Sequence, residues 1–165
     1  MPSSKPLDPA ALMAVVTRVL DENRTMTVAT LRPDGWPQAT VVGFVHEELA
    51  LYFVVARTSQ KLANLQHDPR TSIAIGGAAG PGGEIRGLSM AARVEEVEDP
   101  GEIQRLNALV HERYPGAVVF APRTSNCAVL RARPVILSLV DEAEGLSQPV
   151  LLELSTYTTL KRVAP

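Results

Sequence analysis

The sequence predicts a single α+β domain, mainly β, in which six or seven antiparallel strands form a closed or nearly closed barrel with flanking helices. Short apolar runs typical of strands recur along the chain with brief turns between them, and few segments have helical periodicity. A chain of 165 residues with 45% apolar content can bury one core. Because no repeat or linker divides it, we expect one domain over residues 1–165.

The first expected element is a helix over residues 9–22. Asp8 offers a carboxylate to the free N–H groups of the first turn, and Pro9 fits the first helical position. Apolar residues recur in this segment at helical spacing, so one helix face is expected in the core. That face consists of Leu12, Val15, Val16, Val19 and Leu20.

Three strands are expected next, at residues 25–31, 37–45 and 49–55, with a turn at 33–35 and a tip at 47–48. Proline presets φ in the turn and glycine accepts a positive φ there. Because the connections are so short, we expect the three strands to form an antiparallel meander.

A short helix and two further strands are predicted in the middle of the chain. The helix begins at Thr58 or Ser59 and ends before Pro69, because proline disfavours helical geometry in the residue that precedes it. The strands are expected at residues 71–75 and 88–98, on either side of a glycine-rich loop at 76–87.

The C-terminal third begins with a capping box at 99–102, which predicts a helix over 99–114. Its inward residues are expected to be Ile103, Leu106, Leu109 and Val110. The C-terminal strands are expected between residues 127 and 160. The first, over 127–140, is interrupted or edged at Pro134, because proline has no N–H to donate. After a polar turn, residues 150–160 are predicted to form the last strand.

One segment of the chain combines two cations and two hydroxyls at the start of a short helix: Arg57, Thr58, Ser59, Gln60 and Lys61. The first N–H groups of a helix have no intrahelical acceptor and lie at its positive dipole end. Arg57 and Lys61 add fixed positive charge beside them, which favours an anion site. The alternative is an ordinary capped helix with solvated charges, and the residues alone leave both interpretations open.

Other candidate sites are weaker. The glycines of the loop at 76–87 match neither the phosphate-binding loop nor the dinucleotide fingerprint. The histidines, His46, His67 and His111, lack the spacing of a helical metal site, so no metal is predicted. Cys127, the lone cysteine, begins an expected strand, is expected to be a small core residue and not a nucleophile, and cannot form an intramolecular disulfide. Trp36 is expected to be structural or interfacial.

Charge and hydropathy restrict the partners. A net charge of −2 argues against general binding to nucleic acid or to membrane surfaces, because neither polyanion is attracted by it. The N-terminal stretch lacks the long apolar run and the cleavage pattern of a signal peptide, and no run is long enough to span a bilayer. A cytoplasmic location is therefore expected.

The order of these features resembles the pyridoxamine 5'-phosphate oxidase-like FMN-binding split-barrel family. The resemblance covers about residues 24–99, and its most specific part is the pattern T/S-x-K-x-x-N-L-x-x-D-P-R at 58–70. It implies an antiparallel split β-barrel of the Greek-key type that binds FMN. It also implies a homodimer in which each cofactor lies at the subunit interface and touches both chains.

The resemblance also implies which residues bind the cofactor. Arg57, Ser59 and Lys61 would hold the terminal phosphate of FMN at the start of the helix. The wider set of implied cofactor-binding residues is Thr40, Val41, Val42, Gly43, Val54, Val55, Arg57, Thr58, Ser59, Gln60 and Lys61. Thr40 and Val45 stand where the vitamin-synthesising oxidase has Arg and Lys, so the vitamin substrate is not implied. No catalytic acid or base is predicted.

Three functions are compatible with these features. The first is an FMN-dependent oxidoreductase that acts on an unknown small molecule. The second is a deazaflavin-dependent reductase, because the longer phosphate-bearing tail of a deazaflavin also needs cations. The third is a non-enzymatic flavin- or haem-binding module, in which a histidine would ligate a haem iron.

Overall fold

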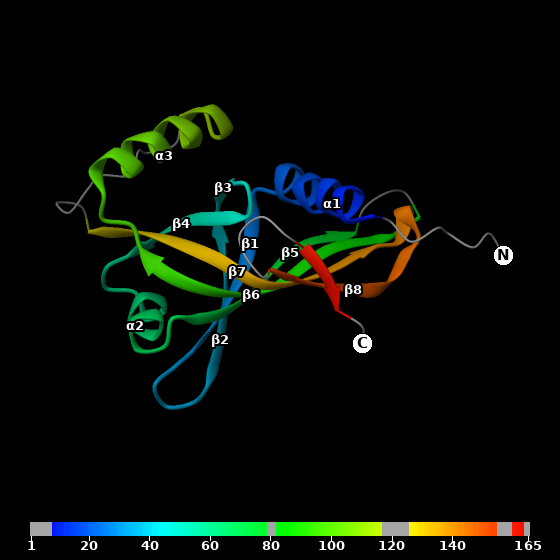
Figure 1. Ribbon diagram of the computed structural model, residues 1–165. Coiled ribbons are helices and arrows are strands. Elements are labelled where there is room, and N and C mark those ends of the chain that lie inside the picture. The colour runs from blue at the N-terminus through cyan, green and yellow to red at the C-terminus, as the bar shows by residue number, and fades with distance from the viewer. Residues whose placement is uncertain (1–7, 79–81, 117–125, 155–159, 164–165) are drawn as a thin grey trace.

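The computed structural model describes residues 8–78, 82–116, 126–154 and 160–163 (Figure 1). In this part of the chain nine antiparallel strands form one curled sheet with the order β2-β1-β5-β6-β7-β4-β3, while β8 pairs with β7 and β9 pairs with β8. The helices are α1 (Pro9–Glu22), α2 (Gln60–His67) and α3 (Pro100–Arg113). The strands are β1 (Thr25–Leu31), β2 (Pro37–Gly43), β3 (Val45–Glu47), β4 (Ala50–Ala56), β5 (Arg70–Ala78), β6 (Ile85–Glu96), β7 (Cys127–Asp141), β8 (Leu146–Leu154) and β9 (Leu160–Val163). The predicted α+β split barrel is confirmed.

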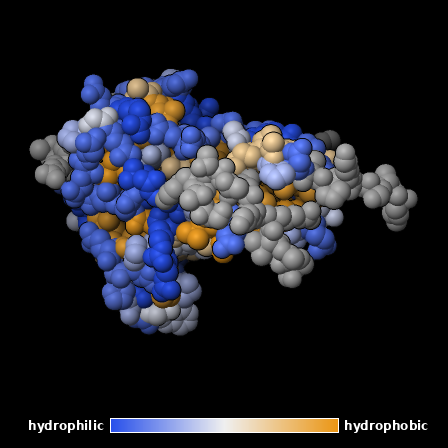
Figure 2. All heavy atoms as spheres, in the orientation of Figure 1, coloured by the Kyte–Doolittle hydropathy of each residue, from blue (hydrophilic) through white to orange (hydrophobic). Residues whose placement is uncertain are grey.

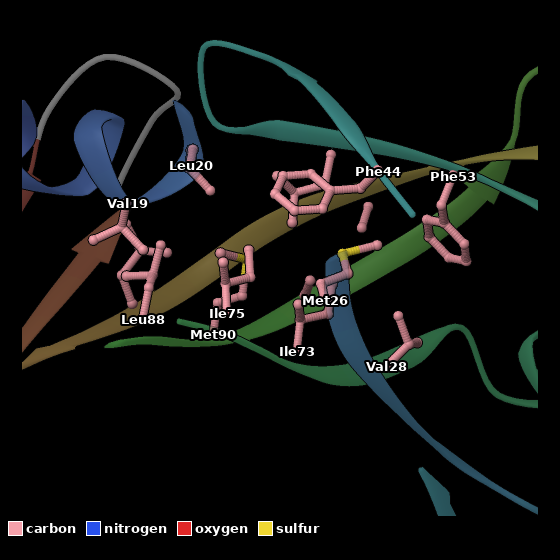
Figure 3. Close-up of a cluster of buried hydrophobic side chains, with 14 of the residues drawn as sticks. Val19, Leu20, Met26, Val28, Phe44, Phe53, Ile73, Ile75, Leu88 and Met90 are labelled. Atoms are coloured by element: carbon pink, nitrogen blue, oxygen red, sulfur yellow. The ribbon is translucent and has the colours of Figure 1, made fainter. Parts of the chain in front are cut away.

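Helix α1 has the predicted bounds and cap. The Asp8 carboxylate accepts a hydrogen bond of 2.7 Å from the backbone N–H of Ala11. All five residues of its predicted apolar face are buried. They join the main core, to which β1, β5 and β6 contribute alternate residues such as Met26, Ile73 and Met90 (Figure 3). The helix therefore covers the open side of the curled sheet.

The predicted meander is wrong after its first hairpin. Strands β1 and β2 pair as expected, but the run at 37–45 breaks at Phe44 into β2 and β3. The Phe44 side chain is buried in the core, and its carbonyl accepts a hydrogen bond from the Tyr114 hydroxyl at 2.8 Å. Strand β4 then pairs with β3 and β7 and not with β2. The chain thus places β2 and β3 at opposite ends of the strand order.

The glycine-rich segment begins and ends in strand where a loop was predicted over its whole length. Strand β5 continues to Ala78 and β6 starts at Ile85, with Gly76 directly opposite Gly87. Gly76 has φ +111°, and a Cβ atom there would lie 2.3 Å from the backbone oxygen of Arg86. Close backbone approach therefore explains why a glycine occurs at position 76 of this strand pair.

Strand β7 connects the two halves of the sheet. Its pairing with β6 shifts register between Ala91 and Ala92, so that Ala92 opposes Pro134 and Ala91 opposes Ile136. On the other edge of β7, pairing with β4 ends at Ala132 and pairing with β8 begins at Ile136. Strand β7 nevertheless continues through Pro134, which is opposite Ala92 beside this register shift and falls between the β4 and β8 pairings of the other edge. The predicted interruption is therefore a bulge and not a break in the strand. Cys127, at the start of β7, is exposed, so its expected place in the core is wrong.

The last predicted strand is displaced in the sequence. Strand β8 begins at Leu146 and not at residue 150, because a 3-10 turn at Glu142–Glu144 reverses the chain early. Gly145 completes that turn with φ 75°. Residues 155–159 of the predicted strand lie outside the described residues, and β9 pairs with β8 as a separate strand.

Helix α3 packs on the outside of the sheet. The Asp99 carboxylate accepts a hydrogen bond of 2.7 Å from the Glu102 N–H, which confirms the predicted cap. Ile103, Leu106 and Val110 are buried in a second apolar cluster, with Leu109 half-buried at its edge. No helix in the described part of the chain is long and apolar enough to cross a membrane.

Candidate functional site

The site lies where β2 and β4 fail to pair. Among the described strands β2 pairs only with β1, and β3 covers β4 only as far as Tyr52, so two free backbone edges remain. A cavity of about 310 Å³ lies at this slit, beside the start of α2. Its lining consists of Gln38, Thr40, Val54, Val55, Ala56, Ser59, Gln60 and Lys61.

The start of α2 supplies hydrogen-bond donors to the cavity. Ser59 is the N-cap residue, and its hydroxyl accepts a hydrogen bond of 3.2 Å from the Leu62 N–H. The backbone N–H groups of Gln60 and Lys61 precede the first intrahelical bond, so the helix itself gives them no acceptor. Both residues line the cavity. This edge of the cavity therefore has a positive electrostatic potential.

Among the described residues, Lys61 is the one cation that lines this cavity. Its side chain is half-buried, and burial lowers the pKa of its ammonium group. No carboxylate in the described part of the chain forms an ion pair with it. Burial removes part of the water that stabilises a charged ammonium group. An anionic ligand bound beside the ammonium group would replace that stabilisation, so the site attracts anions.

Arg57 lies outside the cavity. Its guanidinium forms an ion pair of 2.7 Å with the Glu96 carboxylate of β6, and both side chains are partly exposed. Thr58 does not line the cavity either. Of the two cations in the predicted phosphate segment, the fold therefore brings only Lys61 to the cavity.

The predicted ring-side strand alternates between two environments. Val41 and Gly43 are exposed, whereas Thr40 and Val42 face inward. Val42 packs against the main core, and Thr40 lines the cavity. The Thr40 hydroxyl oxygen is buried and has no hydrogen-bond partner within the described residues. Such an orphaned polar atom is costly unless a ligand or water pairs with it.

A group of polar residues beside the cavity was not predicted. Asn64, which is fully buried on α2, donates to the Thr30 hydroxyl at 2.9 Å and to Gln38 Oε1 at 3.1 Å. Its own Oδ1 accepts from Gln60 Nε2 at 2.8 Å. Gln38 and Gln60 both line the cavity. The sequence signals for this group were an asparagine between apolar residues of a helix and its place in the pattern at 58–70, and neither identifies its partners.

The groups that could act as general acid or base lie elsewhere. Tyr52 lines a second cavity of about 470 Å³, and its hydroxyl donates to Glu102 at 3.2 Å. Burial raises the pKa of the Tyr52 hydroxyl. The His46 ring lies 3.0 Å from both an Asp21 carboxylate oxygen and the Glu48 carbonyl. Neither Tyr52 nor His46 lines the cavity at α2. Within the residues that the structure describes, Lys61 is therefore the one lining side chain that could transfer a proton.

Similar proteins are known for most of this chain. The family described as pyridoxamine 5'-phosphate oxidase matches residues 12–141. No curated protein matches the sequence.

Solved structures share the fold. The general stress protein 26 of Bacillus anthracis is 19% identical with a TM-score of 0.65, and the match covers 87% of this chain and 98% of that one. HutZ, the haem storage protein of Vibrio cholerae, is 20% identical with a TM-score of 0.62, covering 72% and 87%. An F420 reductase is 26% identical with a TM-score of 0.58, covering 73% and 94%.

Proposed function

Because this chain belongs to the pyridoxamine 5'-phosphate oxidase family, we propose that it binds a phosphate-bearing flavin, FMN, in the slit between β2 and β4. We propose further that it acts as an oxidoreductase on a small molecule. The observation that carries this proposal is the half-buried ammonium of Lys61, which lines the cavity beside the N-terminus of α2 without a carboxylate partner among the described residues. Family membership makes a phosphate the natural anion for it.

The residues at the slit suit the rest of a flavin. Val54 and Val55 give one wall an apolar surface, against which a flat ring can pack. The free backbone edges of β2 and β4 offer N–H and C=O groups to the polar edge of the ring. The orphaned Thr40 hydroxyl provides one more hydrogen-bonding group between the apolar wall and Lys61.

When bound, a flavin supplies the hydride and electron transfer itself. The roles of this chain are then to anchor the phosphate through Lys61 and Ser59, to hold the ring against Val54 and Val55, and to limit access of water. Since no carboxylate or histidine in the described part of the chain lines the cavity, we assign no acid or base. A proton needed by the substrate would come from water or from the substrate itself.

A deazaflavin-dependent reductase is the second candidate. The F420 reductase is the relative among these three with the highest identity, at 26%. The same Lys61 site would hold the phosphate of a deazaflavin tail. The visible absorption spectrum of the ligand that co-purifies separates the two candidates, because flavin and deazaflavin differ in colour.

A haem-binding module fits the residues less well. Haem iron needs an axial ligand, and none of His46, His67 and His111 lines the cavity. His46 is engaged by Asp21 and Glu48, and the other two are exposed on helices. A non-enzymatic flavin carrier would have the same cavity as an oxidoreductase. Reduction of the bound flavin by a nicotinamide cofactor, followed at the flavin absorption band, distinguishes the enzyme from the carrier.

We propose that the protein is a homodimer with the cofactor at the subunit interface. The hairpin of β1 and β2 has two strongly exposed apolar residues, Trp36 at 72% and Val41 at 67%. Val41 is on the outer face of the strand whose inner face lines the cavity, so a second copy packed there would lie close to the ligand. Hydrophobic patches also reach the surface on the face shown in Figure 2.

The test is to titrate FMN and riboflavin into the protein and to follow flavin fluorescence. Replacing Lys61 with alanine should weaken FMN binding by about 1.5–3 kcal/mol, the size of a charge-assisted hydrogen bond. Riboflavin has the same ring without the phosphate, so its affinity should hardly change. Arg70→Ala is the matched control, because Arg70 is an exposed cation paired with Asp68 beyond the other end of α2. Equal losses for both ligands would show that Lys61 supports the fold and not a phosphate.

A further inference from the structure

A single residue links the two walls of the slit. Strand β2 forms one wall and β4 forms the other. Gly43, the last residue of β2, pairs with β1, whereas Val45, the first residue of β3, pairs with Tyr52 of β4. Phe44 is the one residue between these two pairings. Its backbone therefore connects the wall made by β2 to the wall made by β4.

The residue that follows α3 holds this link. The Tyr114 hydroxyl oxygen lies 2.8 Å from the carbonyl oxygen of Phe44 and 2.7 Å from the carbonyl oxygen of Arg24. The Arg24 oxygen also accepts a hydrogen bond of 3.2 Å from the Phe44 N–H. Because both carbonyl oxygens can only accept, the hydroxyl proton is shared between them. Tyr114 thus ties the residue before β1 to the residue between β2 and β3.

Arg113 anchors this end of α3 to the body of the fold. Its guanidinium donates to the Leu20 carbonyl at 2.7 Å and to the Asp21 carbonyl at 3.0 Å, at the C-terminal end of α1, where helix carbonyls lack partners. Its Cζ also lies 5.8 Å from the centroid of the Phe44 ring. That ring is part of the main core (Figure 3). Phe44 is therefore restrained through its ring and, by Tyr114, through its carbonyl oxygen.

Neither Arg113 nor Tyr114 touches the cavity, whose described lining residues come from β2, β4 and the start of α2. We propose that Tyr114 is a positioning residue, whose hydroxyl fixes the Phe44 link and so the spacing of the slit in which the flavin ring binds. The inference rests on the proposed function, since the slit is the proposed ring site.

The physical reason is preorganisation. Walls that keep one spacing are already shaped for a flat ring, so binding has less to order. If only a fraction of the free molecules has the right spacing, the apparent dissociation constant rises by the inverse of that fraction. Loss of the Tyr114 hydroxyl should lower this fraction, because the Phe44 carbonyl then loses the donor that holds it.

The test titrates riboflavin and FMN into the full chain with Tyr114→Phe and follows flavin fluorescence. This variant loses the hydroxyl and keeps the ring, whose centroid lies 5.1 Å from Cζ of Arg24. Both ligands should bind about threefold to tenfold more weakly, the equivalent of one ordinary hydrogen bond. The factor should be the same for both, because the phosphate end of the cavity is on α2, which follows β4 and not β2.

Tyr52→Phe is the matched control. It also removes a tyrosine hydroxyl that is hydrogen-bonded within the fold, here to Glu102 of α3 at 3.2 Å, and this hydroxyl does not contact the Phe44 link. Urea unfolding should show that both variants are less stable than the wild type, whereas only Tyr114→Phe should weaken riboflavin binding. An equal loss of riboflavin affinity in both variants would show that affinity merely follows stability, which would overturn the inference.

Hydrogen–deuterium exchange in the ligand-free protein tests the link without any flavin. In Tyr114→Phe the backbone amides of residues 37–47 should exchange faster than in the wild type, while those of β6 should not change. Unchanged exchange at 37–47, or unchanged riboflavin affinity in Tyr114→Phe, overturns the inference while flavin binding stands. Faster exchange at 37–47 in a protein whose wild type binds neither flavin supports the link and shows that the proposed function is wrong.

Discussion

Replacing Asn64 with alanine should lower the free energy of unfolding by about 2 kcal/mol. The structure shows which lost hydrogen bonds and contacts contribute to this change. The Asn64 side chain is fully buried and makes three hydrogen bonds, to Thr30, Gln38 and Gln60. It joins α2 to the two strands of the β1–β2 hairpin, in which Thr30 and Gln38 are directly opposite one another. Its loss therefore affects stability and the wall of the cavity together.

The three partners differ in what they lose. The Thr30 side chain is only 3% exposed, so its hydroxyl would lack water, which costs about 1–3 kcal/mol. Gln38 and Gln60 are not buried and can regain water at little cost. The space left by the missing amide adds somewhat under 1 kcal/mol. Alanine offsets about 0.5 kcal/mol of this because it is the better helix former.

The assay is urea unfolding followed by circular dichroism, with the m-value required to stay unchanged. The matched control is Gln66→Ala, an exposed position on the same helix, which should change the free energy of unfolding by no more than about 0.5 kcal/mol. Combining Asn64→Ala with Thr30→Val should cost less than the sum of the two, because both members of the buried pair are then apolar. A loss below about 0.5 kcal/mol for Asn64→Ala, or strict additivity, would refute this reasoning.

Three further predictions concern other parts of the molecule. Gly76→Ala should destabilise by more than about 1 kcal/mol in urea unfolding, since its φ is positive and its Cβ would clash with backbone, whereas Gly35→Ala, which has a positive φ but open space, should cost less. The pKa of Glu47 is held low by its hydrogen bond to Arg105. The pair therefore stabilises the folded state fully at pH values above the ordinary glutamate pKa of 4.5, and this stabilisation is lost as the pH falls through the lowered pKa. Arg105→Gln should accordingly lower the melting temperature at pH 7 more than at pH 3. Equal decreases in melting temperature at the two pH values would contradict a stabilising role for the Glu47–Arg105 pair. Val41→Glu should weaken dimerisation in sedimentation at micromolar concentration without unfolding the chain; an unchanged sedimentation coefficient would place the interface elsewhere.

The sequence could predict those features that depend on neighbouring residues. The caps of α1 and α3 follow from Asp8 and Asp99, whose carboxylates bond to N–H groups three residues on. The sequence predicted Thr58 or Ser59 as the N-cap of α2, because both have a hydroxyl at the start of the helix, and Ser59 is the cap. In each case the whole interaction lies within one helical turn, so the residue types and their spacing contain it.

The features that were missed depend on distant partners. Nothing near Phe44 indicates that the chain leaves one side of the sheet there, because the break follows from burial of its ring in the core. Nothing near Arg57 in the sequence indicates that it forms an ion pair with Glu96 of β6. Gln38 and Asn64 lie 26 residues apart. Sequence patterns identify residue types at such positions but do not identify pairings across the sheet.

The unpaired edges of β2 and β4 have a consequence for evolutionary drift. Main-chain N–H and C=O groups belong to every residue except proline, which lacks the N–H. Substitutions along these edges therefore exchange side chains and leave the hydrogen-bonding pattern offered to a ring in place. Lys61 has no such substitute, because its charge exists only in its side chain. In a lineage released from selection, phosphate recognition should therefore decay before ring recognition.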